Sequence, residues 1–180
     1  MCGIAGYIGH KKFSKKRIDE ILFLMKRRGP DSFGFKEINE LKKSLSLFFS
    51  RLSIIDQDKR ANQPFFQKDK ILIFNGEIYN YIELRNELKK KGYSFTTSAD
   101  TEVLIKTIDC WGESGIKKLE GMWSFFFYDS SKKISLLSRD RFGEKPLFYY
   151  KKNNEFVFGS EIKIIKSILN KSFNINFNKI

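Results

Sequence analysis

The chain has 180 residues, of which 41% are hydrophobic and 16% aromatic, and this composition excludes an intrinsically disordered protein. Its net charge of +13 comes mostly from lysines that are scattered along the sequence and do not alternate with aromatic residues, so we expect no nucleic-acid or membrane partner. Two cysteines are too few for a disulfide framework, and no apolar run suits a signal peptide or a membrane span, so we expect a cytoplasmic protein.

The first third of the sequence predicts strands separated by a helix. The Ile- and Gly-rich opening, Ile4–Ile8, is typical of a buried strand. Ser14 can cap a helix whose apolar side chains recur at helical spacing and which ends near Arg28. Leu45–Phe49 and Ile71–Phe74 then predict two further strands.

Asn75-Gly76 is a strong local signal for a tight turn after the second of these strands. A helix with Leu84 and Leu88 on its apolar face follows, and Gly92 is placed to end it. Asp100 is placed to cap the next helix, which the apolar spacing extends to Trp111.

The remaining sequence predicts several strands and a last helix. Trp123–Tyr128 is continuously apolar, as expected of a strand that is covered on both faces. The later elements are expected at Ile134–Ser138, Leu147–Tyr150, Phe156–Phe158 and, as a helix, Ile162–Leu169. Buried strands between amphipathic helices favour the α+β class with helix, sheet, sheet and helix in four layers, although the pattern alone leaves other α+β arrangements open.

Cys2 is the first candidate functional residue, because removal of Met1 would leave a thiol and a free α-amine on one residue. A thiol must lose its proton before it attacks a carbonyl group, and the only histidine is His10, which we interpret as a surface turn residue. An α-amine, with a reference pKa of about 7.7–8.0, can replace histidine as the general base. On its own, a free cysteine is more often a small buried side chain, which is how we interpret Cys110.

Nine motifs in a fixed order resemble the class II glutamine amidotransferases, and within them the glutaminase domain of glutamine-hydrolysing asparagine synthetases. They are MCGIAG at the start, RRGPDSFG from Arg27, SRLSIID from Ser50, ANQP from Ala61, FNGEIYN from Phe74, SADTEVL from Ser98, LEGMWSFFFYD from Leu119, RDRFGEKPLFY from Arg139 and FGSEIK from Phe158. Relatives that aminate sugars or phosphoribosyl pyrophosphate carry a histidine before the Asn-Gly pair. Phe74 at that position therefore favours the asparagine synthetase branch.

The resemblance implies an N-terminal-nucleophile hydrolase fold, a four-layer α-β-β-α sandwich, for residues 2–170. It also implies a catalytic set. Cys2 would attack the side-chain amide of glutamine, and its amine would pass the proton to the leaving ammonia. The Asn75 side chain and the N–H of Gly76 would form the oxyanion hole, which needs fixed donors facing the developing charge.

The resemblance implies a second set of residues that binds the ends of glutamine. Arg51 would bind the α-carboxylate, because a guanidinium group matches a carboxylate with two donors. Asp100, helped by Glu77, would bind the α-ammonium group. Taken singly, Asp100 could be only a helix cap and Arg51 only a surface charge. Glu144 stands where the family more often has an apolar residue, and the sequence gives no account of it. We expect no metal site.

Three positions of the arginine-rich motif are expected to support the site without reacting. They are Arg28, Pro30 and Asp31.

Residues 171–180 are expected to begin a linker to a synthetase domain that is missing from this sequence. No S-G-G-x-D pyrophosphate loop is present, so sites for ATP, magnesium and aspartate are expected only in that domain, and this chain needs no cofactor. The expected activity is hydrolysis of glutamine to glutamate and ammonia, which would supply ATP-dependent asparagine synthesis, a carbon–nitrogen ligase reaction of amino-acid biosynthesis. The expected partners are glutamine and the synthetase domain or subunit, and a homodimer is compatible with the sequence.

Two alternatives stay open at this point. One is a class II amidotransferase with another amine acceptor, which the sequence of the missing region would identify. The other is a non-catalytic basic domain that keeps the fold, whose binding to a nucleic acid would weaken steeply with salt.

Overall fold

The computed structural model of the chain describes residues 2–40 and 43–172. Its strands are β1 (Gly3–Gly9), β2 (Ser32–Glu40), β3 (Lys43–Arg51), β4 (Phe65–Gln67), β5 (Lys70–Ile78), β6 (Gly121–Asp129), β7 (Ile134–Arg139), β8 (Phe148–Lys152) and β9 (Glu155–Gly159). Its helices are α1 (Lys15–Met25), α2 (Tyr81–Lys90), α3 (Asp100–Trp111), α4 (Glu113–Lys117) and α5 (Ile162–Leu169), with a short 3-10 turn at Lys59–Ala61.

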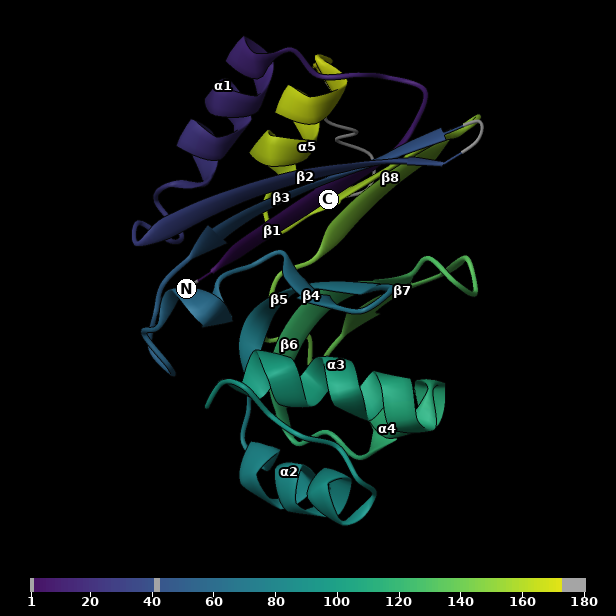
Figure 1. The fold of residues 1–180 in the computed structure, drawn as a ribbon. Helices are drawn as coiled ribbons and strands as arrows, with labels where there is room; N and C mark the ends of the chain where they lie inside the picture. Colours follow the sequence, from purple (N-terminus) through teal and green to yellow (C-terminus); the bar gives the residue numbers. More distant parts are fainter. Residues whose placement is uncertain (1, 41–42, 173–180) are drawn as a thin grey trace.

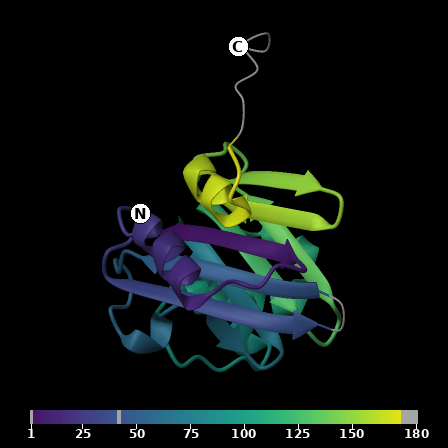
Figure 2. The same cartoon turned by 90° about the horizontal axis from the view of Figure 1, so that it is seen from above.

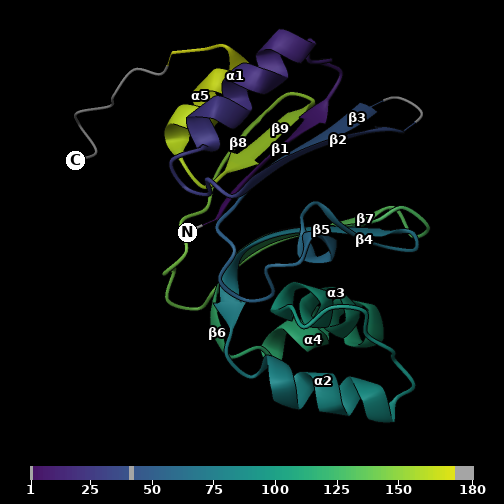
Figure 3. The same ribbon diagram turned by 60° about the vertical axis from the view of Figure 1, so that its left-hand side comes forward.

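Two antiparallel sheets form the centre of the fold. One sheet has the strand order β2-β3-β1-β9-β8 and the other the order β4-β5-β6-β7. Helices α1 and α5 lie on the outer face of the first sheet, and α2, α3 and α4 lie on the outer face of the second (Figure 1; Figure 3). Figure 2, seen from above, shows α1 and α5 lying across the strands of the first sheet. The predicted α+β class and four-layer order are therefore confirmed.

The space between the two sheets is filled by aromatic and branched side chains. The cluster there contains Ile4, Leu45, Leu47, Phe49, Ile71, Ile73, Phe126, Tyr128 and Phe158. Phe126 of β6 and Phe158 of β9 stack with their ring centroids 4.8 Å apart, so they join the sheets directly. Separate apolar clusters lie under α1 with α5 and under α2 with α3.

Most of the predicted elements are present where the patterns place them. Ser14 caps α1, because its hydroxyl accepts a hydrogen bond from the N–H of Arg17 at 3.3 Å. The continuously apolar run lies in β6, between β5 and β7, where both faces of the strand are covered. Among the described residues, no helix is long and apolar enough to cross a membrane. Residues 173–180, and with them most of the expected linker, lie outside the described residues.

The turn predicted at Asn75-Gly76 is wrong. Both residues continue β5, where Asn75 pairs with Ser124 and Gly76 with Trp123 of β6. The pairing with a long neighbouring strand outweighs the local turn preference of an Asn-Gly pair.

The cap predicted at Asp100 is wrong by one residue. The N-cap of α3 is Ala99, and Asp100 is the first residue of the helix. From that position its carboxylate accepts a hydrogen bond from the N–H of Ile78 on β5 at 3.1 Å. The side chain therefore links a helix to a strand instead of closing its own helix.

The structure also contains two strands and a helix that the sequence patterns do not indicate. β2 is an edge strand that pairs only with β3, and edge strands lack the apolar run that identifies a central strand. β4 has three residues and α4 has five, which is too short for a periodic pattern.

Candidate active site

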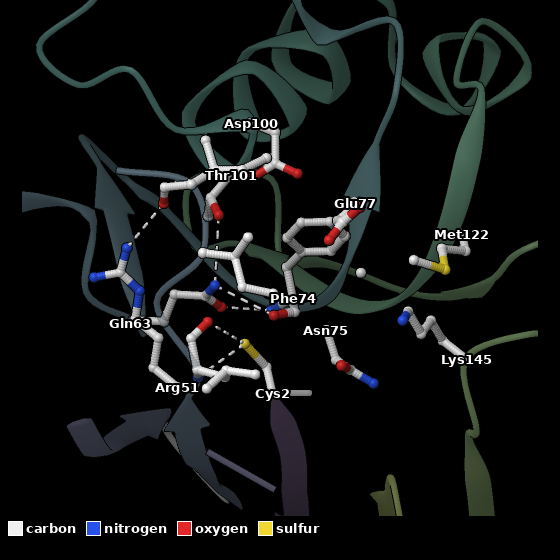
Figure 4. Close-up of a pocket in the computed structure, with 14 residues that line it drawn as sticks. Cys2, Arg51, Gln63, Phe74, Asn75, Glu77, Asp100, Thr101, Met122 and Lys145 are labelled. Atoms are coloured by element: carbon white, nitrogen blue, oxygen red, sulfur yellow. Dashed lines mark hydrogen bonds between the residues drawn. The ribbon is translucent and has the colours of Figure 1, made fainter. Parts of the chain in front are cut away.

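A cavity of about 210 Å³ lies where β1 of one sheet meets β5 of the other. Figure 4 shows Cys2 and Asn75 on the lower side of the site, Asp100 and Glu77 across from them, and Arg51 to the left. The residues predicted for the site all line this one cavity: Cys2, Arg51, Asn75, Gly76, Glu77 and Asp100. Positions that are up to 98 residues apart in the sequence are thus brought together by the pairing of strands.

Cys2 enters the cavity just ahead of β1. Its Sγ accepts the N–H of Leu52 at 3.4 Å and donates to the carbonyl oxygen of Leu52 at 3.6 Å. Arg28 fixes the backbone, because its Nε–H donates to the carbonyl oxygen of Cys2 at 2.9 Å. Burial raises the pKa of the Cys2 thiol above its ordinary value, and the N–H of Leu52 offsets only part of this. The thiol is therefore neutral at rest, and attack needs a proton acceptor.

The side chains of β5 alternate between the two faces of its sheet. Ile71 and Ile73 point towards the other sheet, and Asn75 continues this series. The buried Asn75 side chain donates from Nδ2 to the Ser124 hydroxyl at 3.4 Å. Its amide is thus held by a neighbouring strand at the cavity in which the Cys2 thiol lies.

The backbone groups of β5 alternate as well, along the two edges of the strand. The N–H groups of Phe74 and Ile78 both bond to side chains, Gln63 and Asp100, on the edge away from β6. Gly76 lies between them, so the N–H of Gly76 is directed to this same edge, beside the cavity that it lines. A Cβ at Gly76 would be 2.2 Å from the carbonyl oxygen of Met122, so only glycine fits here.

Asp100 places an acidic group at the opposite wall from the thiol. The residue is only 5% exposed, and burial raises the pKa of its carboxyl group to about 6. The N–H groups of Ile78 and Thr101 act against this rise, and the charge of Glu77 adds to it. The pair of acidic residues can therefore receive a cationic group, which would also relieve the cost of burying their charge.

Arg51, at the end of β3, is buried, and its guanidinium group is surrounded by the following loop. Nη1 donates to the carbonyl oxygen of Asp58 at 3.3 Å and to Asn62 Oδ1 at 2.8 Å. Nη2 donates to the carbonyl oxygens of Ile55, at 3.3 Å, and Asp56. These four hydrogen bonds use the donors on Nη1 and Nη2, and the Nε–H of Arg51 takes part in none of them. Arg51 therefore supports the loop that lines the cavity besides contributing its positive charge.

Two of the expected supporting residues have clear contacts. Arg28 holds Cys2 as described, and Asp31 Oδ2 accepts the N–H of Ser53 at 2.7 Å, which fixes the loop after Arg51. His10 is exposed, and Cys110 packs half-buried against the core beneath α3. No cluster of three or more His, Cys, Asp or Glu side chains suited to a metal ion occurs within residues 2–40 and 43–172.

Sequence reasoning missed several residues of the cavity wall, among them Gln63, Thr101, Met122 and Lys145. Lys145 is held by a turn built on the Asp140 carboxylate, which accepts four backbone N–H groups, among them those of Glu144 at 2.9 Å and Lys145 at 3.0 Å. The side chain of Glu144 is exposed. Gln63 and Lys145 lie in the motifs ANQP and RDRFGEKPLFY, but their place in the wall depends on where strands end, which the motifs do not reveal.

Comparison with known proteins gives one family. Residues 1–180 match the family described as glutamine amidotransferase domain. Asparagine synthetase 1 (glutamine-hydrolysing) of Bacillus subtilis is 39% identical over 170 residues, which cover 91% of this chain and 26% of that protein. Asparagine synthetase 3 of the same organism is 36% identical over 173 residues, covering 92% of this chain and 27% of that protein. The chain thus spans about a quarter of the length of these relatives.

The fold is also similar to a solved structure of B. subtilis glutamine phosphoribosylpyrophosphate amidotransferase, determined with ADP and GMP. The TM-score is 0.74 at 20% sequence identity, over 93% of this chain and 43% of that chain. This likeness confirms the predicted N-terminal-nucleophile hydrolase fold and, at this identity, the fold alone.

Proposed function

The chain belongs to the glutamine amidotransferase domain family, and from this premise we propose that it hydrolyses glutamine to glutamate and ammonia through a thioester on Cys2. One observation carries the proposal. A half-buried thiol, two fixed N–H donors and an acidic pair, of which Asp100 is buried and Glu77 half-buried, line a single cavity between the sheets. Hydrolysis of a zwitterionic amide needs these three kinds of group.

In the proposed reaction, Cys2 Sγ attacks the side-chain amide carbon of glutamine while the α-amine of Cys2 takes the thiol proton. The amine would be exposed by removal of Met1, which lies outside the described residues. Charge develops on the amide oxygen, where the Asn75 Nδ2–H and the Gly76 N–H stabilise it. The C–N bond then breaks, ammonia leaves with the proton from the amine, and water hydrolyses the thioester to glutamate. The step needs no cofactor.

The ends of glutamine are proposed to be bound by opposite charges. Asp100 and Glu77 bind the α-ammonium group, since both acidic side chains line the cavity beside the N–H of Gly76. Arg51 binds the α-carboxylate through its charge and its Nε–H, because the other guanidinium donors bond to the loop. A glutamine whose two ends are fixed presents its side-chain amide at a defined distance.

We further propose that the ammonia serves asparagine synthesis from aspartate in a synthetase domain or subunit that uses ATP and magnesium. The support is that the similar proteins are named as glutamine-hydrolysing asparagine synthetases and are about three and a half times as long as this chain. The cytoplasm is the compartment that suits the reaction, because both cysteines are free thiols and a reducing environment keeps them so.

The proposal is tested with Cys2→Ala and with Cys110→Ala as the matched control. We expect Cys2→Ala to abolish glutamine hydrolysis and covalent labelling by an electrophilic glutamine analogue, because no other thiol lines the cavity among the described residues. Cys110→Ala should keep both. Mass spectrometry of the wild-type protein should show one adduct on a chain without Met1. Hydrolysis by Cys2→Ala at the wild-type rate would reject the proposal.

A further inference from the structure

The pairing of β4 with β5 ends at Leu72, a few residues before Asn75 and Gly76 of β5. Phe65 pairs with Leu72, and β4 begins at Phe65, directly after Pro64. In this antiparallel register, the next position of the same kind pairs residue 63 with Phe74. The N–H and carbonyl groups of Phe74 would therefore be left without a strand partner.

The side chain of Gln63 takes the place of the missing strand. The N–H of Phe74 donates to Gln63 Oε1 at 2.6 Å, and Gln63 Nε2 donates to the carbonyl oxygen of Phe74 at 3.2 Å. An amide side chain has one acceptor and one donor side by side, which is what a backbone partner would offer. Gln63 is 8% exposed, so both bonds are shielded from water.

The next N–H on this edge of β5 is that of Gly76, and beyond it the N–H of Ile78 is bound by the Asp100 carboxylate at 3.1 Å. Gln63 and Asp100 thus hold the strand on both sides of the proposed oxyanion donor. Gln63 Nε2 also lies 3.5 Å from the Thr101 hydroxyl, on the helix that carries Asp100. The same amide therefore connects the strand with the donor to the helix with the acidic residue.

We propose that Gln63 is a positioning residue for the hydrolysis, because its amide fixes the edge of β5 on which the Gly76 N–H is presented to the substrate. The inference rests on the proposed function. We call the two hydrogen bonds between the Gln63 side chain and the backbone of Phe74 the clamp. The inference predicts that loss of the clamp weakens binding of the transition state more than binding of the ground state, since the oxyanion exists only in the transition state.

The test uses Gln63→Glu and Gln63→Met, with Gln57→Glu as the control for added charge on the exposed part of the same loop. Both Gln63 variants keep the length of the side chain. Gln63→Met removes both hydrogen bonds, and in Gln63→Glu an ionised carboxylate faces the Phe74 carbonyl oxygen without a proton to donate. We expect kcat at pH 8 to fall about 10- to 100-fold, as for a small misplacement of a catalytic group, with KM and the Kd of glutamate nearly unchanged.

Two readouts separate positioning from a merely structural role. An aldehyde analogue of glutamine forms a tetrahedral adduct with Cys2 whose oxygen needs the oxyanion hole, so its binding should weaken by the same factor as kcat. In Gln63→Glu, the activity relative to wild type should recover as the pH falls towards 5.5, because a protonated carboxyl group again offers one donor and one acceptor. The ratio to wild type cancels the titration of Cys2 and Asp100 that the two proteins share, and Arg51, Glu77 and Lys145 line the same cavity in both.

Wild-type kcat in both Gln63 variants would overturn the inference. So would equal weakening of the aldehyde and of glutamate, or variants that do not fold at any pH, since either result assigns Gln63 to stability alone. A wild-type chain that forms no adduct and hydrolyses no glutamine would overturn the proposed function instead. In that case hydrogen exchange at the Phe74 amide still tests the clamp: exchange as slow in Gln63→Met as in wild type would reject it.

Discussion

Burial raises the pKa of the Asp100 carboxyl group to about 6. In the unfolded chain the same group ionises near 3.8, so between these values the folded state binds more protons than the unfolded state. Stability therefore falls as the pH rises from about 3.8 to about 6 and stays lowered above it. The shift corresponds to about 3 kcal/mol, and this cost fits the role proposed for Asp100, in which an anion binds an ammonium group.

We expect Asp100→Asn to be more stable than the wild-type protein at pH 8 and to lose this advantage as the pH falls to 4. The change of about 2.4 kcal/mol between these pH values follows from the pKa of Asp100, since asparagine has no proton to lose and still accepts the N–H of Ile78. Urea denaturation of both proteins at a series of pH values measures it. A stability difference that does not depend on pH would contradict the assigned ionisation. The variant should also have a raised KM for glutamine.

Sequence alone named the residues that are proposed to react and to bind substrate, and they line one cavity, but it did not name the groups that hold them. Cys2, Asn75 and Arg51 are recognisable because their chemistry is rare or because they lie in ordered motifs. Gln63 is not, because its importance comes from the end of β4 and from the register of β5, which are properties of the folded chain. The Leu52 backbone groups beside the thiol have no side-chain signature for the same reason.

Strand β5 shows how tertiary structure decides a local ambiguity. An Asn-Gly pair favours a turn, and only pairing with β6 along its whole length keeps these residues extended. The extended form places the Asn75 side chain on the face of the strand that looks to the other sheet, and the Gly76 N–H along the edge of the strand. A turn would present the same two groups in another geometry, so here the fold was easier to predict than the form of the oxyanion hole.

Gly34 of strand β2 lies close to the backbone of Gln63, and this contact gives a prediction for Gly34→Ala. A Cβ at Gly34 would lie 2.3 Å from the carbonyl oxygen of Gln63 and 2.7 Å from Pro64 Cδ, so the segment with Gln63 must move. We expect kcat to fall while the Kd of glutamate stays nearly constant. Gly159→Ala is the control, since the nearest atom to its Cβ, at 3.5 Å, is in ordinary contact. Equal kcat in the two variants would show that β2 does not restrain Gln63.

At the scale of the whole molecule, the candidate site depends on how the two sheets are placed. Cys2 lies just ahead of β1 in the first sheet, and the proposed oxyanion donors lie on β5 in the second. Side chains such as Phe126 and Phe158 fix the spacing between the two sheets. A basic binding domain without catalysis would not need a buried acidic residue beside a half-buried thiol at this junction. The net charge of +13 is therefore better explained by scattered surface lysines than by a binding track.

We expect Phe126→Ala to lower the free energy of unfolding by about 3–5 kcal/mol, because it leaves a cavity between the sheets. It should also reduce kcat, since the thiol and its oxyanion donors are then less well aligned. Phe142→Ala, at a side chain that is 88% exposed, should change stability by less than about 0.5 kcal/mol. Urea denaturation and turnover measured on both variants check this. If Phe126→Ala is strongly destabilised but keeps full activity, catalysis does not depend on the spacing that Phe126 maintains between the sheets.

The order of strands in the first sheet has a consequence for the newly made polypeptide. β1 lies between β3 and β9, and the N–H and carbonyl groups of Ile4 bond to Ser160, so the earliest strand is completed by the latest one. During translation, a chain that has emerged only as far as β5 already contains Cys2, Asn75 and Gly76. It lacks β9, which pairs with β1, so the position of these residues is not yet fixed. On the proposed function, hydrolysis of glutamine would begin only after almost the entire domain has left the ribosome.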